Sequence, residues 1–281
     1  MSLAFGYGTN GFANHRLNDA LGLIAELGYV GVAITLDHSH LDPYANGLSG
    51  RVAAVRASLF RYGLACVVET GARYLLDPHR KHSPTLLDNA SPRRIEFLRR
   101  AIDIGADLGA SAVSFWAGVR PSTVDHRTAW DRLTAGCAQV VAYADRAGMP
   151  LGFEPEPGML VETIDGWTTL RALLGNPPGF GLTLDIGHCR SIETLSVPDC
   201  VREAAPHLVN VQIDDARRGV HEHLEFGAGE IDFPPVLAAL RDVGYRGLVA
   251  VELPRHSHAA PEVGARSLAF LRAAEREPAI R

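Results

Sequence analysis

Short apolar runs alternate with longer amphipathic segments along the whole chain of 281 residues. The apolar runs are too short to be buried helices and predict β-strands, which we expect at residues 3–9, 30–36, 64–70, 112–116, 150–154, 180–186, 208–213 and 247–253. Between them, apolar residues recur at helical spacing, which predicts helices at residues 15–27, 50–62, 91–109, 125–147, 163–174, 197–205, 233–243 and 261–274. The chain therefore repeats a strand–helix unit eight times.

Glycine residues mark the boundaries of these units. Most predicted helices end at a glycine just before the next strand, as at Gly28, Gly63 and Gly148, because glycine adopts the positive φ angle of a helix end most easily. Eight such units without a break in composition predict an α/β fold, a single-domain (β/α)8 TIM barrel over residues 1–281. The main alternative is an open, doubly wound sheet. Its phosphate loop is missing, since GYGTNG after the first strand lacks the GxGxxG spacing.

The fifth to eighth predicted strands end in side chains that carry a ligand oxygen, namely Glu154, Asp185, Gln212 and Glu252. In a parallel barrel the carboxyl ends of all strands meet at one mouth, so these side chains converge although they are far apart in the sequence. Three carboxylates meeting without a cation would repel each other, or one would have to bind a proton. We predict one divalent metal ion here, with Mg²⁺ or Mn²⁺ favoured by the oxygen-rich set and Co²⁺ or Zn²⁺ left open.

Each of these acids also has a plainer interpretation, because an acid at a strand end is often a helix N-cap or part of a salt bridge. Four such residues in consecutive strands favour the shared site. Glu156 could replace Glu154 as the ligand, since it lies two residues further along on the same side. Asp214 and Asp215 follow Gln212 in the same run and are further candidates.

Other residues at the predicted mouth are candidates for substrate binding, and they are Glu69, Trp116, Glu156, His188, Arg217 and His223. Each has a structural alternative: Trp116 could stack on a sugar or fill the barrel, and Arg217 could meet an acidic group or only solvent. The longest irregular segment, residues 72–90, is the candidate lid. Its basic residues would suit a substrate with a carboxylate or phosphate group, and these residues are Arg73, His79, Arg80, Lys81 and His82. The alternative is that the segment is a solvated loop.

Composition and charge limit the class of partner. Lys and Arg total 27 against 32 Asp and Glu, so no overall positive field favours nucleic acid or an anionic membrane. No apolar run approaches the ~20 residues of a membrane span, and no signal-peptide pattern precedes the first strand. The cysteines, Cys66, Cys137, Cys189 and Cys200, lack CxxC spacing, which indicates free thiols. We expect a cytoplasmic protein that binds a small molecule, with a homodimer left open.

The second half of the chain resembles a known superfamily. The motifs LTLDIGHC, HLVNVQIDD, HEHLEFGAGEIDF and PPVLAALRDVGYRGLVAVELP are similar to those of the xylose-isomerase-like TIM barrel superfamily. Its members include sugar-phosphate isomerases, ketose 3-epimerases, inosose-handling enzymes and apurinic-site endonucleases. The resemblance is specific over residues 150–254 and rests mostly on strand order before them.

The resemblance implies a role for several of the candidate residues. It implies that Glu154, Asp185, Gln212 and Glu252 bind the metal. It also implies that Glu154 and Glu252 form an acid–base pair on opposite sides of the substrate, and that the polar contacts near the substrate include His188 and His223.

Three positions depart from parts of the superfamily. Gln212 stands where most members carry histidine and is similar to the hydroxypyruvate-isomerase branch, which makes zinc a poorer fit. The three-zinc cluster of the endonuclease branch needs histidines where this chain offers Glu69 and Trp116. A nuclease or nucleic-acid lyase is therefore disfavoured.

The implied reaction begins with removal of a proton next to a carbonyl group that the metal polarises. Return of the proton to the neighbouring carbon gives isomerisation, return to the opposite face gives epimerisation, and loss of a β-hydroxyl gives dehydration. We expect a metal-dependent isomerase or epimerase that acts on a sugar or a related hydroxy-carbonyl compound. An inosose or cyclitol dehydratase or epimerase, and a barrel that binds a metabolite without turnover, are the alternatives.

Overall fold

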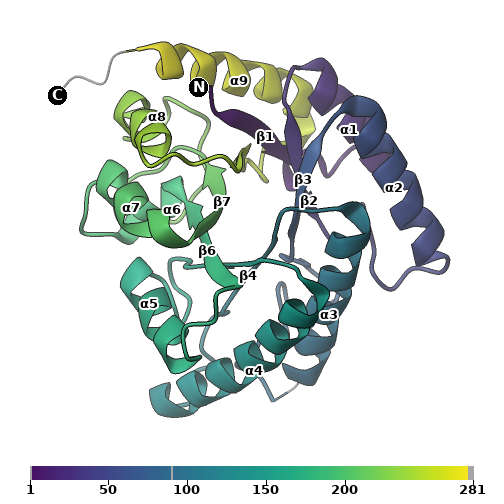
Figure 1. Cartoon of the computed structure of the whole chain (residues 1–281), viewed down its shortest axis with the longest axis vertical. Helices are drawn as coiled ribbons and strands as arrows, with labels where there is room; N and C mark the ends of the chain where they lie inside the picture. Colours follow the sequence, from purple (N-terminus) through teal and green to yellow (C-terminus); the bar gives the residue numbers. More distant parts are fainter. Residues whose placement is uncertain (1, 90, 278–281) are drawn as a thin grey trace.

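The computed structural model describes residues 2–89 and 91–277 (Figure 1). Its strands are β1 (Ala4–Gly8), β2 (Gly31–Thr35), β3 (Ala65–Glu69), β4 (Val113–Trp116), β5 (Leu151–Glu154), β6 (Phe180–Asp185), β7 (Leu208–Ile213) and β8 (Leu248–Val251). Its α-helices are α1 (Leu17–Glu26), α2 (Leu48–Tyr62), α3 (Ser91–Leu108), α4 (His126–Ala147), α5 (Ile164–Leu173), α6 (Ile186–Ile192), α7 (Val197–Ala204), α8 (Phe233–Asp242) and α9 (Ala260–Arg276). The 3₁₀ turns are η1 (Thr9–Phe12), η2 (Ala205–His207) and η3 (Ser257–Ala259).

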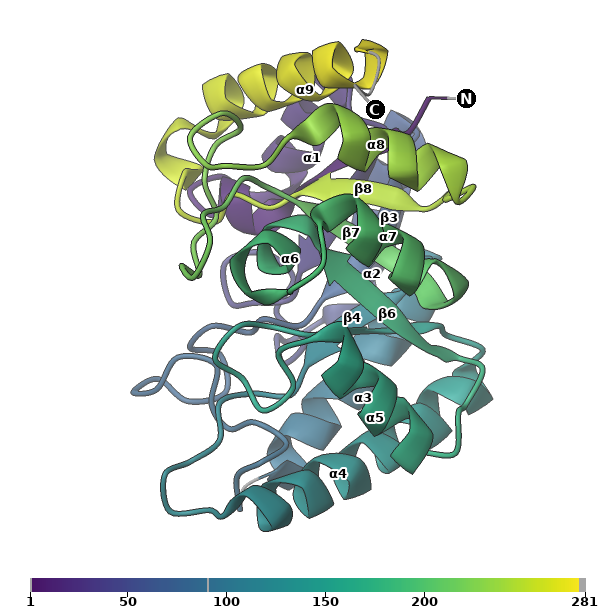
Figure 2. The ribbon, with the colours of Figure 1, turned by 90° about the vertical axis from the view of Figure 1, so that its left-hand side faces the viewer.

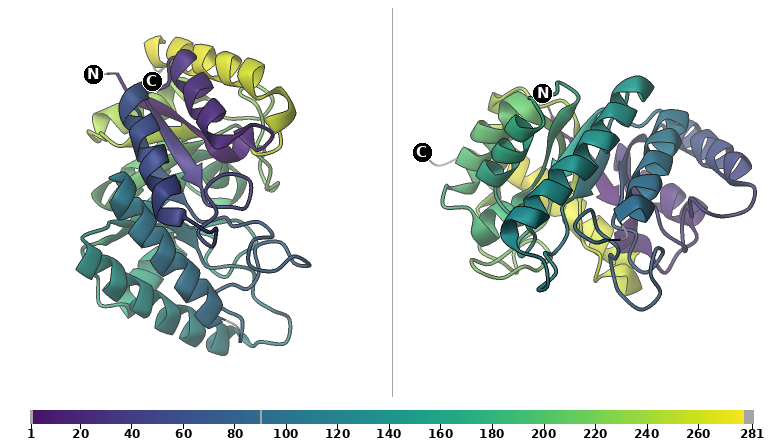
Figure 3. Two further views of the ribbon diagram at one scale, coloured as in Figure 1. Left: turned by 90° about the vertical axis from the view of Figure 1, so that its right-hand side faces the viewer. Right: turned by 90° about the horizontal axis from the view of Figure 1, so that it is seen from below.

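The strands form one closed barrel in the order in which they occur in the chain. Every neighbouring pair is parallel, including β1 with β8, which closes the ring. Figures 2 and 3 show the helices around the barrel and the long loops gathered at one of its ends. The predicted (β/α)8 TIM barrel is confirmed, and the open sheet is excluded because an open sheet leaves two edges unpaired.

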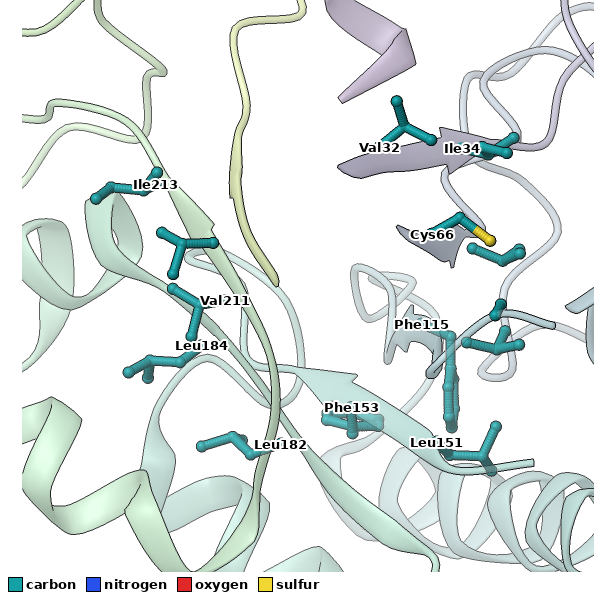
Figure 4. Close-up of a cluster of buried hydrophobic side chains, with 14 of the residues drawn as sticks. Val32, Ile34, Cys66, Phe115, Leu151, Phe153, Leu182, Leu184, Val211 and Ile213 are labelled. Atoms are coloured by element: carbon teal, nitrogen blue, oxygen red, sulfur yellow. The ribbon is translucent and has the colours of Figure 1, made fainter. Parts of the chain in front are cut away.

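Side chains alternate between two layers along each strand. Figure 4 shows part of the apolar layer between strands and helices, with labelled side chains such as Ile34, Phe153 and Val211. Burial of an aliphatic or aromatic side chain of this size contributes ~1.5–3 kcal/mol, so this layer holds the helices on the barrel. The strand residues that alternate with these side chains form a separate, smaller cluster, in which Ala33 and Ala250 pack with Leu248.

The interior of the barrel is narrow at the end where the strands begin. A Cβ atom at Gly31 would lie 2.4 Å from Cδ1 of Leu248, and one at Gly152 would lie 2.2 Å from Oγ1 of Thr183. Glycine is needed at both positions because a neighbouring side chain already fills the space. Side chains thus fill the interior of the barrel near the amino ends of the strands. The polar side chains at the carboxyl ends of the strands lie at the opposite end of the barrel.

The predicted helices agree with the observed ones to within two residues at each end. Gly63 and Gly148 follow α2 and α4 with φ angles of 65° and 64°, as expected for glycines that end a helix. One helix was not predicted: β6 stops at Asp185, one residue before the predicted end of the strand, and α6 begins directly after it at Ile186. The Asp185 side chain accepts a hydrogen bond from the His188 N–H at 2.8 Å and so caps α6.

The segment after β3 has no helix or strand in residues 72–89, and Ala90, the last residue of the predicted lid, lies outside the described residues. Two contacts tie this segment to the barrel. Arg73 Nη2 donates to the carbonyl oxygen of Asn10 at 3.0 Å, and Nδ1 of His82 lies 2.5 Å from the carbonyl oxygen of Gly71. The segment therefore starts beside the ends of β1 and β3.

Two expectations from composition can be compared with the structure. The four cysteines are free thiols, as their spacing predicts, and the structure shows in addition that all four are buried. In the part of the chain that the structure describes, no helix has both the length and the apolar character needed to cross a bilayer.

Candidate functional site

The strand ends place the four predicted metal ligands at the same mouth of the barrel. Glu154 is the last residue of β5, and Asp185 is the last residue of β6. Gln212, near the end of β7, stands opposite Asp185 in the strand register. Glu252 follows β8 directly, and its backbone N–H donates to the carbonyl oxygen of Ile213 at 3.1 Å. Four neighbouring strands, β5 to β8, therefore bring these side chains to one mouth of the barrel.

Asp185 lies at the centre of this arrangement. Potential ligand atoms of Asp185, Glu154 and His188 lie within 4.8 Å of one another. Asp185 forms a second group of this kind with His223 and Glu252, within the same limit. Gln212 lines the same cavity as the two glutamates. The predicted oxygen donors thus converge.

One oxygen of several of these side chains is buried without a hydrogen-bond partner among the described residues. These atoms are Oδ2 of Asp185, Oε1 of Gln212 and Oε2 of Glu252. In both acids the other oxygen is fixed, since Asp185 caps α6 and Glu252 Oε1 accepts from the side-chain amide of Asn10 at 2.8 Å. A buried oxygen without a partner is costly unless a donor or cation satisfies it. The donor set therefore fits a divalent cation held through oxygen.

The charges at this mouth favour a cation as well. Burial, followed by the charge of Glu252, raises the pKa of Glu154 well above its ordinary value and the pKa values of Glu69 and Glu156 to about 8. Burial also opposes the charge of Asp185, but its histidine neighbours and the capping hydrogen bond lower its pKa. A cation would stabilise the carboxylates in their charged forms.

His188 is held in one orientation in the first turn of α6. Its Nδ1 lies 3.1 Å from the carbonyl oxygen of Pro155, which can only accept, so Nδ1 carries the hydrogen and Nε2 carries the lone pair. Burial lowers the pKa of His188 to about 4, which keeps the ring neutral near pH 7. Nε2 is buried without a hydrogen-bond partner among the described residues and lies 4.0 Å from Oδ2 of Asp185. This nitrogen is available to a cation or a substrate hydroxyl.

Asp214 orients a second histidine at the mouth. It is fully buried just after β7, and its Oδ2 contacts Nδ1 of His223. Burial alone would lower the pKa of His223, but the Asp214 carboxylate outweighs it and raises the pKa to about 10. Asp214 therefore positions His223 at the edge of the cavity.

Asp215, in contrast, anchors the loop that follows β7. Its carboxylate accepts hydrogen bonds of 2.8–3.1 Å from backbone N–H groups of Ala216, Gly227, Gly229 and Ile231. A Cβ atom at Gly229 would lie 2.2 Å from Oδ1 of Asp215, so this position needs glycine. The GAGEID motif thus wraps a buried carboxylate and holds in place the loop that carries His221 and His223.

A cavity of about 400 Å³ lies at this mouth. It is lined by five of the six predicted substrate contacts, namely Glu69, Trp116, Glu156, His188 and His223. Glu69, at the end of β3, accepts a hydrogen bond from the Asn210 side chain at 3.1 Å. Trp116, at the end of β4, lies under the guanidinium of Arg94, whose carbon is 4.2 Å from the ring centre.

Arg217 is the predicted substrate contact that does not line the cavity. Its guanidinium donates to the carbonyl oxygen of Ala228 at 2.8 Å and pairs with Glu222 at 3.4 Å. These contacts lie within the loop after β7. The geometry therefore does not support a substrate contact for Arg217, because its guanidinium is used to hold the loop.

Two of the cavity residues that the sequence did not indicate are Asn10 and Arg255. Asn10, in η1 after β1, orients Glu252, and the exposed Arg255 joins Arg73 and Lys81 of the predicted lid in lining the cavity. Their places in the sequence could have indicated that both residues lie at the mouth, because Asn10 follows the first strand and Arg255 comes three residues after Glu252. The mouth thus combines acids with a basic rim formed by Arg73, Lys81 and Arg255.

Comparison with known proteins gives a consistent result. A model of the family described as xylose isomerase-like TIM barrel matches residues 21–274. The L-ribulose-5-phosphate 3-epimerase UlaE of Salmonella paratyphi C (strain RKS4594) is 29% identical over 198 residues, or 68% of each chain. The structure of D-allulose 3-epimerase from Methylomonas sp. in complex with D-allulose is similar with a TM-score of 0.76 and 21% identity over 97% of each chain. That of 3-keto-D-glucoside 4-epimerase, YcjR, from E. coli has a TM-score of 0.78 and 18% identity over 97% of this chain and 100% of that one. The resemblance seen in the sequence is confirmed, and the chain belongs to the xylose isomerase-like TIM barrel family.

Proposed function

We propose that this protein is a divalent-metal-dependent sugar epimerase in which a proton is exchanged through Glu154 and Glu252. The placement of these glutamates supports this most strongly. β5 and β8 stand three positions apart in the ring of eight strands, so the two side chains approach the mouth from different directions. Each lies close to Asp185, in a group of ligand atoms within 4.8 Å of one another. The sugar epimerases among the similar proteins support the same class of reaction.

The described residues suit each step of such a reaction. Asp185 and Gln212 would hold the cation together with the two glutamates, and the cation would polarise the substrate carbonyl and acidify the adjacent C–H bond. One glutamate takes this proton, which leaves the carbon planar. The other glutamate delivers a proton to the opposite face, so the configuration inverts and the composition of the sugar is unchanged. Acid–base catalysis of this kind typically contributes ~10²- to 10⁴-fold.

A deuterium-exchange experiment tests this function. The protein loaded with Mn²⁺ or Mg²⁺ is incubated in D₂O with ketoses, ketose phosphates and an inosose, and the products are examined by NMR. We expect deuterium at the carbon next to the carbonyl, with inverted configuration, only when metal is present. Deuterium at the former carbonyl carbon would identify an isomerase instead. Loss of water from the inosose would identify a dehydratase, and the absence of any exchange would identify a protein that binds a metabolite without turnover.

The basic rim favours a substrate that carries an anionic group such as a phosphate. Arg73, Lys81 and Arg255 line the same cavity as the acids, so one molecule could meet the metal at one end and the basic rim at the other. Arg and Lys side chains form charge-assisted hydrogen bonds with phosphate oxygens. A ketose phosphate therefore fits this cavity better than a neutral ketose.

Replacing Arg255 by Ala should raise KM for the phosphorylated ketose about tenfold, or about 1.4 kcal/mol, with little change in kcat. The arginine is exposed at the cavity and is expected to contact only the anionic end of the substrate. Steady-state kinetics with the phosphorylated and the free ketose measure the effect. Arg56→Ala, on an exposed part of α2, is the matched control and should leave KM unchanged. An equal rise in KM for both ketoses would contradict a role in phosphate binding.

A further inference from the structure

Glu69 is a buried residue of the cavity to which the proposed proton exchange gives no role. It ends β3, and its Oε1 accepts a hydrogen bond from Nδ2 of Asn210 at 3.1 Å. Asn210 is fully buried on β7, two residues before Gln212. Because β3 and β7 stand opposite each other in the ring of eight strands, this bond crosses the inside of the barrel. The carboxyl group of Glu69 is therefore held at the floor of the cavity.

The surroundings of Glu69 fix its position and keep it uncharged. Ser114 is its partner in the register of β3 and β4, and Oγ of Ser114 accepts a hydrogen bond from Oγ1 of Thr183 at 3.0 Å. The carboxyl groups whose charges reach Glu69 are those of Glu154, Asp185 and Glu252. Burial, followed by the charge of Glu252, raises the pKa of Glu69 to about 8, so the group carries a proton at pH 7. Since Asn210 donates to Oε1, the other oxygen, Oε2, is the one that can donate this hydrogen.

His82 places a hydrogen-bond acceptor in the same cavity. Its Nδ1 lies 2.5 Å from the carbonyl oxygen of Gly71, two residues after Glu69, so Nδ1 carries the hydrogen and Nε2 carries the lone pair. Burial lowers the pKa of His82 to about 4, which keeps the ring neutral near pH 7. The ring meets Trp116 edge to face, with the ring centres 5.4 Å apart. The end of β3 therefore positions both a donor and an acceptor at the cavity.

The backbone that holds His82 is strained. Ala72, Arg73 and His82 have φ angles of 57°, 35° and 62°, and they are three of the four non-glycine residues with positive φ in the described part of the chain. Each such conformation costs on the order of 1–3 kcal/mol. The N–H of His82 donates to the carbonyl oxygen of Arg73 at 2.6 Å, which joins the two ends of residues 73–82. Strain of this kind clusters at ligand-binding positions, so it supports a binding role for His82.

We propose that Glu69 and His82 form a subsite that binds a hydroxyl group of the substrate, with Glu69 as the hydrogen-bond donor and His82 as the acceptor. The proposed metal ligands come from β5 to β8, whereas this subsite belongs to β3 and the segment after it. Lys81 of the basic rim is next to His82. The hydroxyl group therefore lies between the carbon that reacts and the phosphate. This inference rests on the proposed function and narrows the substrate to a ketose phosphate with a free hydroxyl group at that place.

Calorimetry with the Mn²⁺-loaded protein tests the subsite without measuring turnover. The probes are the pentulose 5-phosphates, ribulose and xylulose in both enantiomers, and their 4-deoxy analogues, which lack the hydroxyl group between the reacting carbon and the phosphate. We expect removal of this hydroxyl group to weaken binding about tenfold. Equal affinity for the preferred pentulose phosphate and its 4-deoxy analogue would overturn the subsite, and no binding of any probe would overturn the substrate class.

Two variants at position 69 separate a substrate contact from a structural role. Glu69→Gln keeps a donor and an acceptor and should retain the preference for the hydroxylated probe, whereas Glu69→Leu removes both and should lose most of this preference. Glu262→Leu, on the exposed first turn of α9, is the matched control and should keep the preference. A folded Glu69→Leu protein that keeps the preference would contradict the assignment, because a structural defect weakens the binding of both probes alike.

His82→Asn should lower the preference in the same way. Asn tolerates a positive φ angle, and its shorter side chain withdraws the acceptor from the cavity. His79→Asn makes the same change at an exposed position of the same segment and should have no effect. Unchanged preference in His82→Asn would remove His82 from the subsite. A preference without deuterium exchange would overturn the epimerase function and leave the subsite in place, whereas exchange without the preference would overturn the subsite alone.

Discussion

Replacing Glu252 by Gln should leave the fold intact and lower kcat by about 10²- to 10⁴-fold, the usual contribution of a general acid or base. Oε1 of Glu252 accepts a hydrogen bond from Asn10 at 2.8 Å, and an amide oxygen can accept the same bond, so the side chain keeps its place. The other oxygen, Oε2, has no hydrogen-bond partner among the described residues and becomes an NH₂ group that cannot take a proton from carbon. Deuterium exchange into the epimerised ketose measures the loss.

Two measurements separate catalysis by Glu252 from metal binding by the same residue. Glu262→Gln makes the same chemical change on the exposed first turn of α9 and should keep full activity. Titration of the Glu252→Gln protein with Mn²⁺ shows whether the metal still binds, and bound metal without turnover assigns the loss to proton transfer. A variant that retains more than half of the wild-type kcat would remove Glu252 from the mechanism.

Asp185→Asn should weaken Mn²⁺ binding by more than the roughly 10- to 100-fold that loss of an outer hydrogen-bond partner costs a metal site. The exchange activity should fall with it. Asn and Asp are equally good helix N-caps, so the amide oxygen can still accept the His188 N–H bond that is 2.8 Å long here. The unpartnered Oδ2 becomes an NH₂ group that cannot coordinate a cation. Isothermal titration calorimetry with Mn²⁺ measures the affinity, and circular dichroism checks the fold.

The matched control for this variant is Asp125→Asn, which makes the same exchange at the N-cap of α4. There the Asp125 side chain accepts from the N–H of Thr128 at 2.9 Å and is exposed on the surface. Stability and metal affinity should both stay close to wild type. Unaltered Mn²⁺ affinity in Asp185→Asn would show that this carboxylate does not ligate the ion.

Much of the fold could be predicted from the sequence because the barrel imposes a strict alternation on its strands. In β5, Phe153 is buried in the helix-facing layer and Gly152 fits the narrow interior, so even a strand of four residues has a clear pattern. α6 could not be predicted in this way. It has seven residues, and Ile186 continues the apolar pattern of β6. The Asp185 cap, a contact between side chain and backbone, decides where the strand ends.

The candidate site was predictable as far as strand topology determines it. Glu154 and Asp185 converge with the other predicted ligands because parallel strands carry their ends to one mouth, whatever the loops do. Contacts made by loops depend on the path of the backbone, which the local pattern does not contain. Arg217 is an example, since its bond to the Ala228 carbonyl exists because Asp215 folds the loop back on itself.

The hydrogen bond between Asn10 and Glu252 joins residues that are 242 positions apart, across the seam between β1 and β8. A growing polypeptide presents Asn10 early and acquires its acceptor only after the last strand has been synthesised and has docked against the first. The proposed proton-transfer pair is therefore complete only once β8 has joined the barrel. Products of premature termination before residue 252 would lack both the closed seam and the second of the proposed glutamates.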